Sequence, residues 1–185
     1  MIELNVSEIL KPESDLEKTI VSNQEFVIGC LYGKPRSGHP EGQVIYHIAE
    51  VLKNINKYSD FTNRADLRLV GLIHDTFKYK VYTDIPKTGE NHHGMIARRF
   101  AERFISTARV LETIELHDEA YNSWRKLALN RFKAERRANE LISRLGKDID
   151  FYLTFFRCDN ETGDKSHENY DWFADLERTR VKIKS

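Results

Sequence analysis

Apolar residues recur mainly at intervals of three and four along this chain, with glycine- and proline-rich segments between them. This spacing is typical of amphipathic helices. The clearest apolar stripe follows Gly42 and consists of Val44, Ile48, Val51 and Ile55. No segment alternates between apolar and polar residues over the length of a strand. The pattern therefore predicts an all-α protein, a helical bundle.

Further apolar segments predict more helices. One contains residues 69–73, and Asn63 is its candidate N-terminal cap. Asn91 is the candidate cap of the next, whose stripe consists of Ile96, Phe100 and Phe104. The stripe after it consists of Val110, Ile114, His117 and Tyr121. We also expect a long charged helix over 124–145 and a short buried one over 149–156.

The remaining segments predict loops at 33–42, 83–92 and 158–169. No repeat or interdomain linker separates the helices, and 185 residues suit a single domain. We expect that domain to span 1–185, with a core at about 38–165 and helical extensions at both ends.

Charge and cysteine content narrow the class of protein. The 29 basic and 29 acidic residues cancel, so bulk charge does not indicate a strongly basic nucleic-acid binder, although a local basic patch remains open. Cys30 and Cys158 form no CxxC pair, which argues against a disulfide framework and a cysteine-ligated zinc site. No apolar run approaches the roughly 20 residues of a membrane span, and the charged N-terminal segment lacks a signal-peptide core. We expect a cytoplasmic protein without a membrane partner.

The doublet His74-Asp75 directly follows the apolar segment LVGLI. Burying an ionised carboxylate without a partner costs several kcal/mol, so Asp75 needs a cation, a capping role or access to solvent. A divalent metal would satisfy both side chains, whereas an Asp75 that ends a helix at the surface would need none. His47 and His117, each at an apolar helix face, would separately be explained as hydrogen-bonded core histidines.

Other histidines and an aspartate also lie at the ends or on the inward faces of predicted helices. His92 and His93 begin one predicted helix, His117 lies on the inward face of another, and Asp159 shares a face with Phe155 four residues earlier. Helical bundles build metal sites from ligands that converge from several facing helices.

The order of these residues resembles the HD superfamily of metal-dependent phosphohydrolases. His47 in HIAEV matches the first histidine of that family, and Asp159 its distal aspartate. His74 and Asp75 match the doublet for which it is named, and Lys78 matches the lysine of HD-x-x-K. The order H…HD…H…H…D is similar to that of the branch of the superfamily that can hold two metals. In this order His92 and His117 match the third and fourth histidines.

Two local stretches of sequence add to the resemblance. GHPEGQVIYHIAEVL is similar to the HPEG-x-V-x-x-H stretch of HD modules attached to bacterial tRNA nucleotidyltransferases. NHHGMIARRF is similar to the H-E-x-x-G-A stretch that follows the doublet there. This alignment makes His92 the ligand and leaves His93 as the alternative, since Ile96 stands where that stretch has glycine.

The resemblance implies hydrolysis of a phosphomonoester or phosphodiester, of a nucleotide or a nucleic-acid end, by a metal-activated hydroxide, with Asp75 and Lys78 as catalytic residues. One or two divalent ions are implied; mixed histidine and carboxylate ligation suits Mn, Fe, Co, Ni or Zn better than Mg. The residues expected to hold the substrate phosphate are Lys78, Arg157, Lys34 and Arg36. His39 would either support the ligands or be a plain loop histidine. The alternatives are a di-iron oxygenase and a non-catalytic regulatory HD module.

Overall fold

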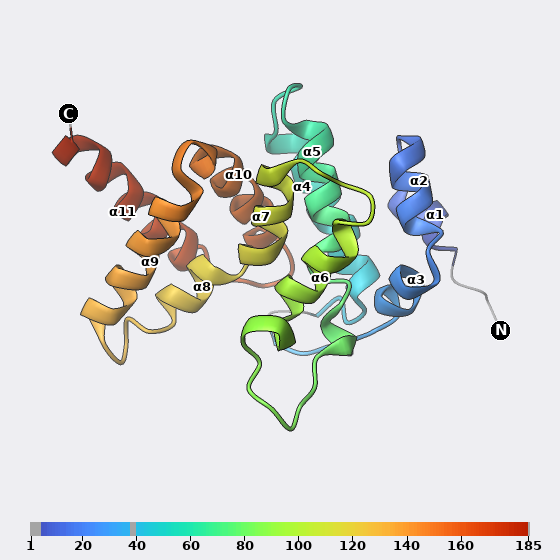
Figure 1. The fold of residues 1–185 in the computed structure, drawn as a ribbon, viewed down its shortest axis with the longest axis horizontal. Helices are drawn as coiled ribbons and strands as arrows, with labels where there is room; N and C mark the ends of the chain where they lie inside the picture. The colour runs from blue at the N-terminus through green and yellow to red at the C-terminus, as the bar shows by residue number, and fades with distance from the viewer. Residues whose placement is uncertain (1–4, 38–39, 185) are drawn as a thin grey trace.

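The computed structural model describes residues 5–37 and 40–184, and within them the chain forms helices and no β-strand (Figure 1). The all-α prediction is confirmed. The α-helices are α1 (Val6–Leu10), α2 (Asp15–Val21), α3 (Gln24–Cys30), α4 (Val44–Tyr58), α5 (Arg64–Ile73), α6 (His93–Ala101), α7 (Ala108–Leu116), α8 (Glu119–Trp124), α9 (Arg131–Leu145), α10 (Ile149–Asn160) and α11 (Glu168–Lys184).

Helix α10 lies between two hydrophobic clusters. Phe151 and Phe155 belong to the larger cluster, which α4, α5, α6 and α7 share with the N-terminal helices. Tyr152 and Phe156 belong to the smaller cluster, formed with α8, α9 and α11. Because two neighbouring faces of α10 are buried in this way, the helix lies at the junction of the two clusters.

Two glycines allow close approaches between helices near that junction. A Cβ atom on Gly71 would lie 2.9 Å from Ile55 Cδ1, so a side chain here would require the Ile55 side chain to move. A Cβ atom on Gly94 would lie 2.4 Å from the backbone oxygen of Glu115, so α6 approaches α7 at a position that admits only glycine.

The prediction of one helix over 124–145 is wrong. Helix α8 ends at Trp124, and α9 begins only at Arg131. Asn130 is extended, and its side-chain oxygen accepts a hydrogen bond from Lys133 N at 2.9 Å. An asparagine cap of this kind starts a new helix where the periodicity of the side chains shows no interruption.

The predicted cap Asn91 is also wrong. His92 caps α6, while the buried Asn91 amide bonds Tyr82 N, Tyr82 O and Pro86 O, and so closes the loop that precedes the helix. Helix α6 ends at Ala101, so Phe104 of the expected stripe lies beyond it. The stripe that was expected to continue from Val110 to Tyr121 is divided between α7 and α8.

Cys30 and Cys158 are both buried and free, in agreement with the prediction of no disulfide framework. In the part of the chain that the structure describes, no helix has the length and apolar character required to cross a membrane.

Candidate metal centre

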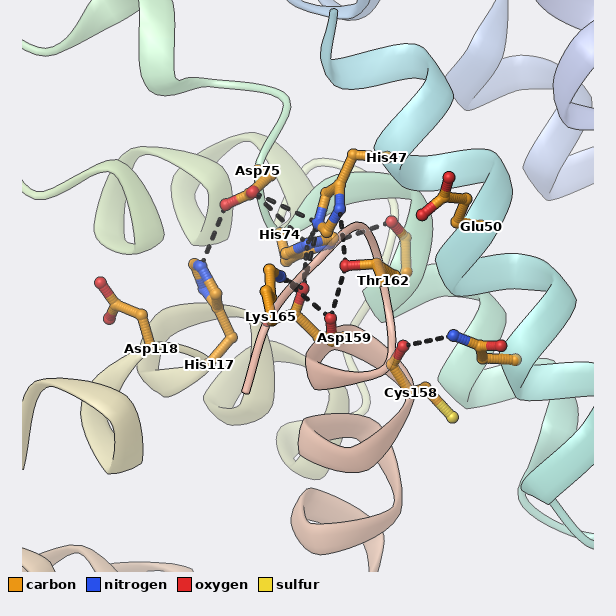
Figure 2. A network of polar contacts seen from close by, with 12 residues as sticks. His47, Glu50, His74, Asp75, His117, Asp118, Cys158, Asp159, Thr162 and Lys165 are labelled. Carbon is orange, nitrogen blue, oxygen red and sulfur yellow. Dashed lines mark hydrogen bonds and ion pairs between the residues drawn. The ribbon is translucent and has the colours of Figure 1, made fainter. Parts of the chain in front are cut away.

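Side chains from the ends of several helices meet at one place (Figure 2). His47 lies in the first turn of α4, and Asp159 lies in the last turn of α10. His74 and His117 follow directly after α5 and α7, each as the C-terminal cap. His47, His74, Asp75 and His117 are all buried, with exposed fractions of 4% or less.

A backbone carbonyl determines which nitrogen of His74 carries the proton. His74 Nδ1 lies 3.0 Å from the carbonyl oxygen of Gly71, which can only accept a hydrogen bond. We therefore assign the proton to Nδ1, and Nε2 directs a lone pair into the centre. His74 is completely buried, so water cannot reach this nitrogen.

Thr162 orients His47 in the same way. The Thr162 hydroxyl donates its single proton to the backbone oxygen of Asp159 at 2.7 Å, so it accepts from His47 Nδ1 at 3.3 Å. Glu41 Oε1 lies 3.6 Å from the same nitrogen. A carboxylate beside the outer nitrogen of a histidine is the usual support of a metal-binding imidazole. Nε2 of His47 thus also faces the centre.

The first group consists of His47, His74 and Asp159. Nε2 of His47 lies 3.2 Å from Nε2 of His74 and 3.0 Å from Asp159 Oδ1. Two nitrogen lone pairs and a carboxylate oxygen at these separations repel one another unless a cation lies among them. Ligands about 2.0–2.1 Å from one tetrahedral ion are themselves about 3.4 Å apart, so the group suits a metal ion.

A second group repeats this chemistry with Asp75, His93 and His117. His117 Nδ1 lies 2.9 Å from the carbonyl oxygen of Ile114, which assigns the proton to Nδ1 as in His74. Its Nε2 then faces His93 Nε2 at 3.0 Å and Asp75 Oδ1 at 3.2 Å. Asp75 Oδ1 is buried and accepts no hydrogen bond from the described residues, so it has room for a cation.

Asp75 belongs to both groups. Its Oδ2 atom lies 3.5 Å from His47 Nε2 and 3.7 Å from His74 Nε2. Its Oδ1 atom faces His93 and His117. One carboxylate therefore presents one oxygen to each group, which is the arrangement expected of a bridge between two ions.

Burial and neighbouring charges set the ionisation of these groups. Burial lowers the pKa of His74 to about 3, so this imidazole is neutral near pH 7. Burial opposes ionisation of Asp75, but the Lys78 ammonium holds its pKa well below the usual value. For Asp159, the Lys165 ammonium outweighs burial in the same way and holds the pKa well below its usual value. Neutral imidazoles and ionised carboxylates are the forms that bind metals.

The structure places His93, rather than His92, beside Asp75 and His117. His92 Nδ1 accepts a hydrogen bond from Gly94 N at 3.2 Å, which assigns the proton to Nε2. That nitrogen lies 3.3 Å from Asp118 Oδ2. His92 therefore caps α6 and orients Asp118, and we take the alternative ligand, His93, into the proposal below.

The four residues expected to hold phosphate lie in different places. Lys78 and Arg36 line a cavity of about 600 Å³ whose wall includes Asp75, His93 and Asp159. Lys34 is exposed in its loop and is not part of that wall. Arg157 lies outside the cavity, with its guanidinium 3.0 Å from Glu161 and 3.9 Å from the centre of the Tyr58 ring. His39 falls outside the described residues.

Several site residues were missed at the sequence level. Lys165 lines the cavity and bonds Asp159 Oδ1 at 3.0 Å, and it lies in a segment that the sequence marks only as a loop. Thr162 lies in the same loop. Asp118 contacts His92, and the only signal for it was a second His-Asp doublet at His117. Glu41 belongs to the HPEG stretch. The resemblance of that stretch to HD modules gave no role for this residue.

Helix α4 also holds the segment that carries Asp159. Asn54 donates to the backbone oxygens of Cys158 and Glu161, at 2.9 and 3.0 Å. Glu50 Oε2 accepts from Gly163 N at 2.9 Å. These bonds attach the end of α10 and the following turn to the helix that carries His47.

A family model, the HD domain, matches residues 44–151, which is more than half of the 185-residue chain. The chain belongs to the HD domain family. No curated protein and no solved structure matches it. The family match contains His47, His74, Asp75, His93 and His117. It ends before Asp159, which the structure places 3.0 Å from His47 Nε2, in agreement with the position expected of the distal aspartate.

Proposed function

We propose that this HD domain hydrolyses phosphoesters with the help of two divalent ions. His47, His74 and Asp159 would hold one ion, His93 and His117 the other, and Asp75 would bridge them. The observation that supports this most directly is that the two oxygens of Asp75 face separate groups of imidazoles. When bound, the ions would polarise the phosphoryl oxygens and make an attacking water more acidic.

Cationic side chains around the ligands favour a phosphate substrate. Lys78, Lys165 and Arg36 line the cavity beside the two groups. Lys78 contacts Asp75 Oδ2, and Lys165 contacts Asp159, so each ammonium lies next to a proposed ligand. They would neutralise the phosphate and orient it for in-line attack. The substrate would be a phosphomonoester or phosphodiester of a nucleotide or a nucleic-acid end.

Metal removal tests this proposal. We expect EDTA to abolish hydrolysis of a panel of phosphomonoesters and phosphodiesters, and Mn²⁺ or Co²⁺ to restore it. Removal should also lower the melting temperature by about 5–10 °C relative to protein with metal at about 100 times its Kd, because the ligands then repel one another in a buried site. Activity assays and thermal unfolding with and without EDTA provide the measurement.

Elemental analysis and oxygen consumption provide the controls. Two irons per chain with O₂ uptake and no phosphoester hydrolysis would contradict the proposal in favour of a di-iron oxygenase. Absence of bound metal, with a melting temperature that EDTA leaves unchanged, would indicate a regulatory module without catalysis.

Lys78 and Arg157 form a matched pair of substitutions. Lys78→Ala should lower phosphoester hydrolysis by about 10–1000-fold, the effect of removing one electrostatic contact to the reacting phosphoryl group. Arg157→Ala should leave hydrolysis within about twofold, since surface substitutions away from a site have small effects and its guanidinium contacts Glu161 and Tyr58. Turnover and bound metal are measured for both variants. Equal losses of hydrolysis in the two variants would show that the cavity is not where the phosphate binds.

A further inference from the structure

The cavity at the metal centre extends along α8. Asp118 lies directly before this helix, and Tyr121 and Trp124 also line the cavity. A helix rises 1.5 Å per residue, so Trp124 lies about 9 Å beyond Asp118 along the helix axis. The sugar of a nucleotide would span a comparable distance between a phosphate at the metal centre and a base at Trp124.

Tyr121 and Trp124 form a flat aromatic surface. Their ring centroids are 6.0 Å apart and their planes differ by 27°. The guanidinium of Arg125 lies 5.8 Å from the centre of the Tyr121 ring. Tyr121 is 40% exposed, so its ring is accessible to a ligand in the cavity. Aromatic and guanidinium planes in such an arrangement are suited to stacking on a nucleobase.

Amide groups face the same cavity. Asn160 and Asn169 contribute to its wall, and as whole residues they are only 3% and 5% exposed. Asn160 Nδ2 donates to Ser166 O, which holds the amide in place. An amide can donate or accept a hydrogen bond and so complements the edge of a base. An apolar ligand group in the same place would leave the amide unsatisfied.

The arginines of α9 are poorly suited to binding extended nucleic acid. Arg131 and Arg137 have their guanidinium groups on Glu135 and Glu119. Arg136 lies 3.6 Å from Glu140. Because glutamates already compensate these guanidinium charges, this face of α9 would bind a phosphate backbone only weakly. The cavity volume of about 600 Å³ is within the range for a small molecule.

We infer that Tyr121 and Trp124 form the base-stacking subsite of a nucleoside monophosphate whose phosphate lies at the metal centre. The inference rests on the proposed function for the phosphate end. The base end depends on separate residues and can be tested by itself.

Fluorescence of Trp124 tests base binding without turnover. Trp124 and Trp172 are the two tryptophans of the chain, and Trp172 packs against the smaller hydrophobic cluster outside the cavity wall. Trp172→Phe therefore leaves Trp124 as the single reporter. With EDTA present, we expect AMP to quench its emission saturably and ribose 5-phosphate to leave it unchanged. No change with AMP, or the same change with both, would overturn the inference.

Kinetics with metal present provide the second measurement. Trp124→Leu should lower the ratio of kcat/KM for AMP to that for ribose 5-phosphate by about 5–150-fold, since stacking contributes roughly 1–3 kcal/mol per base. Trp124→Phe should retain part of the preference, and Trp172→Phe should keep all of it. A ratio that Trp124→Leu does not change would refute the subsite.

The two proposals fail in different ways. If AMP quenches Trp124 but no phosphoester is hydrolysed, the base subsite stands and the proposed function is wrong. If both phosphates are hydrolysed equally and no quenching occurs, the proposed function stands and the subsite is wrong. Quenching by a single-stranded oligonucleotide but not by AMP would overturn the inference in favour of a nucleic-acid end.

Discussion

Asp75→Asn should lower phosphoester hydrolysis by at least about a thousandfold, because the substitution removes a charged ligand that faces both groups of imidazoles. Asparagine has nearly the same size, so the surrounding helices should still pack and the protein should remain folded. The stabilisation by added metal should be lost together with activity. Hydrolysis, bound metal and melting temperature with and without Mn²⁺ are the measurements.

Asp175→Asn is the matched control, since Asp175 is exposed on α11 and pairs only locally with Arg178. It should retain the activity, metal content and melting behaviour of the parent protein. Near-normal turnover in Asp75→Asn, on a substrate that the parent hydrolyses well, would exclude the proposed mechanism.

His93→Ala should reduce the bound metal from two ions per chain to one under saturating Mn²⁺. His93 Nε2 lies 3.0 Å from His117 Nε2 and 3.5 Å from Asp75 Oδ1, so its removal opens the second group and leaves the first intact. Hydrolysis should fall by roughly a hundredfold or more, since one of two ions that stabilise the reacting oxygens is lost. Elemental analysis beside activity assays measures both effects.

His92→Ala is the comparison that distinguishes the two neighbouring histidines. It removes the cap of α6 and the contact with Asp118, which should cost about 0.5–2 kcal/mol of stability. The variant should still bind two ions, with a smaller loss of activity than His93→Ala. If His92→Ala instead lost one ion while His93→Ala kept both, the assignment of the ligand would have to be reversed.

The helical class could be predicted from the periodicity of the sequence, and the residues of the first group from its resemblance to the HD superfamily. The periodicity of Val44, Ile48 and Val51 places His47 at the edge of a buried helix face, as the structure shows. The position of His74-Asp75 after an apolar segment indicated a buried carboxylate that needs a cation, and Asp75 is 4% exposed. Both inferences depend on neighbours within a turn or two of one helix, which local spacing determines.

Local spacing also bears on Arg157. It lies two residues before Asp159 on α10, and residues two apart on a helix point in different directions. Lys78 follows Asp75 by three residues and can turn back to it. The sequence placed both residues within three positions of an expected ligand. Only the structure separates them, because Lys78 lines the cavity and Arg157 contacts Glu161 and Tyr58 outside it.

The choice between His92 and His93 depended on the tertiary structure. The two residues differ by one position at the start of α6, where the sequence does not determine which of them caps the helix. Asn91 was the expected cap, but its amide is occupied by Tyr82 and Pro86, and His92 takes the capping position instead. The close approach of α6 to α7 at Gly94 then brings His93 to His117.

Lys165 and the aromatic surface of α8 were likewise decided only by the tertiary structure. Lys165 reaches Asp159 because Asn54 and Glu50 hold the segment after α10 against α4, more than 100 residues earlier in the chain. Trp124 lines the cavity from the last position of α8, whereas the sequence predicted it as the first residue of a helix over 124–145. The sequence determined which faces of the helices are buried. Contacts between distant segments decided which side chains share a cavity, because those contacts depend on packing and backbone bonds that no local pattern records.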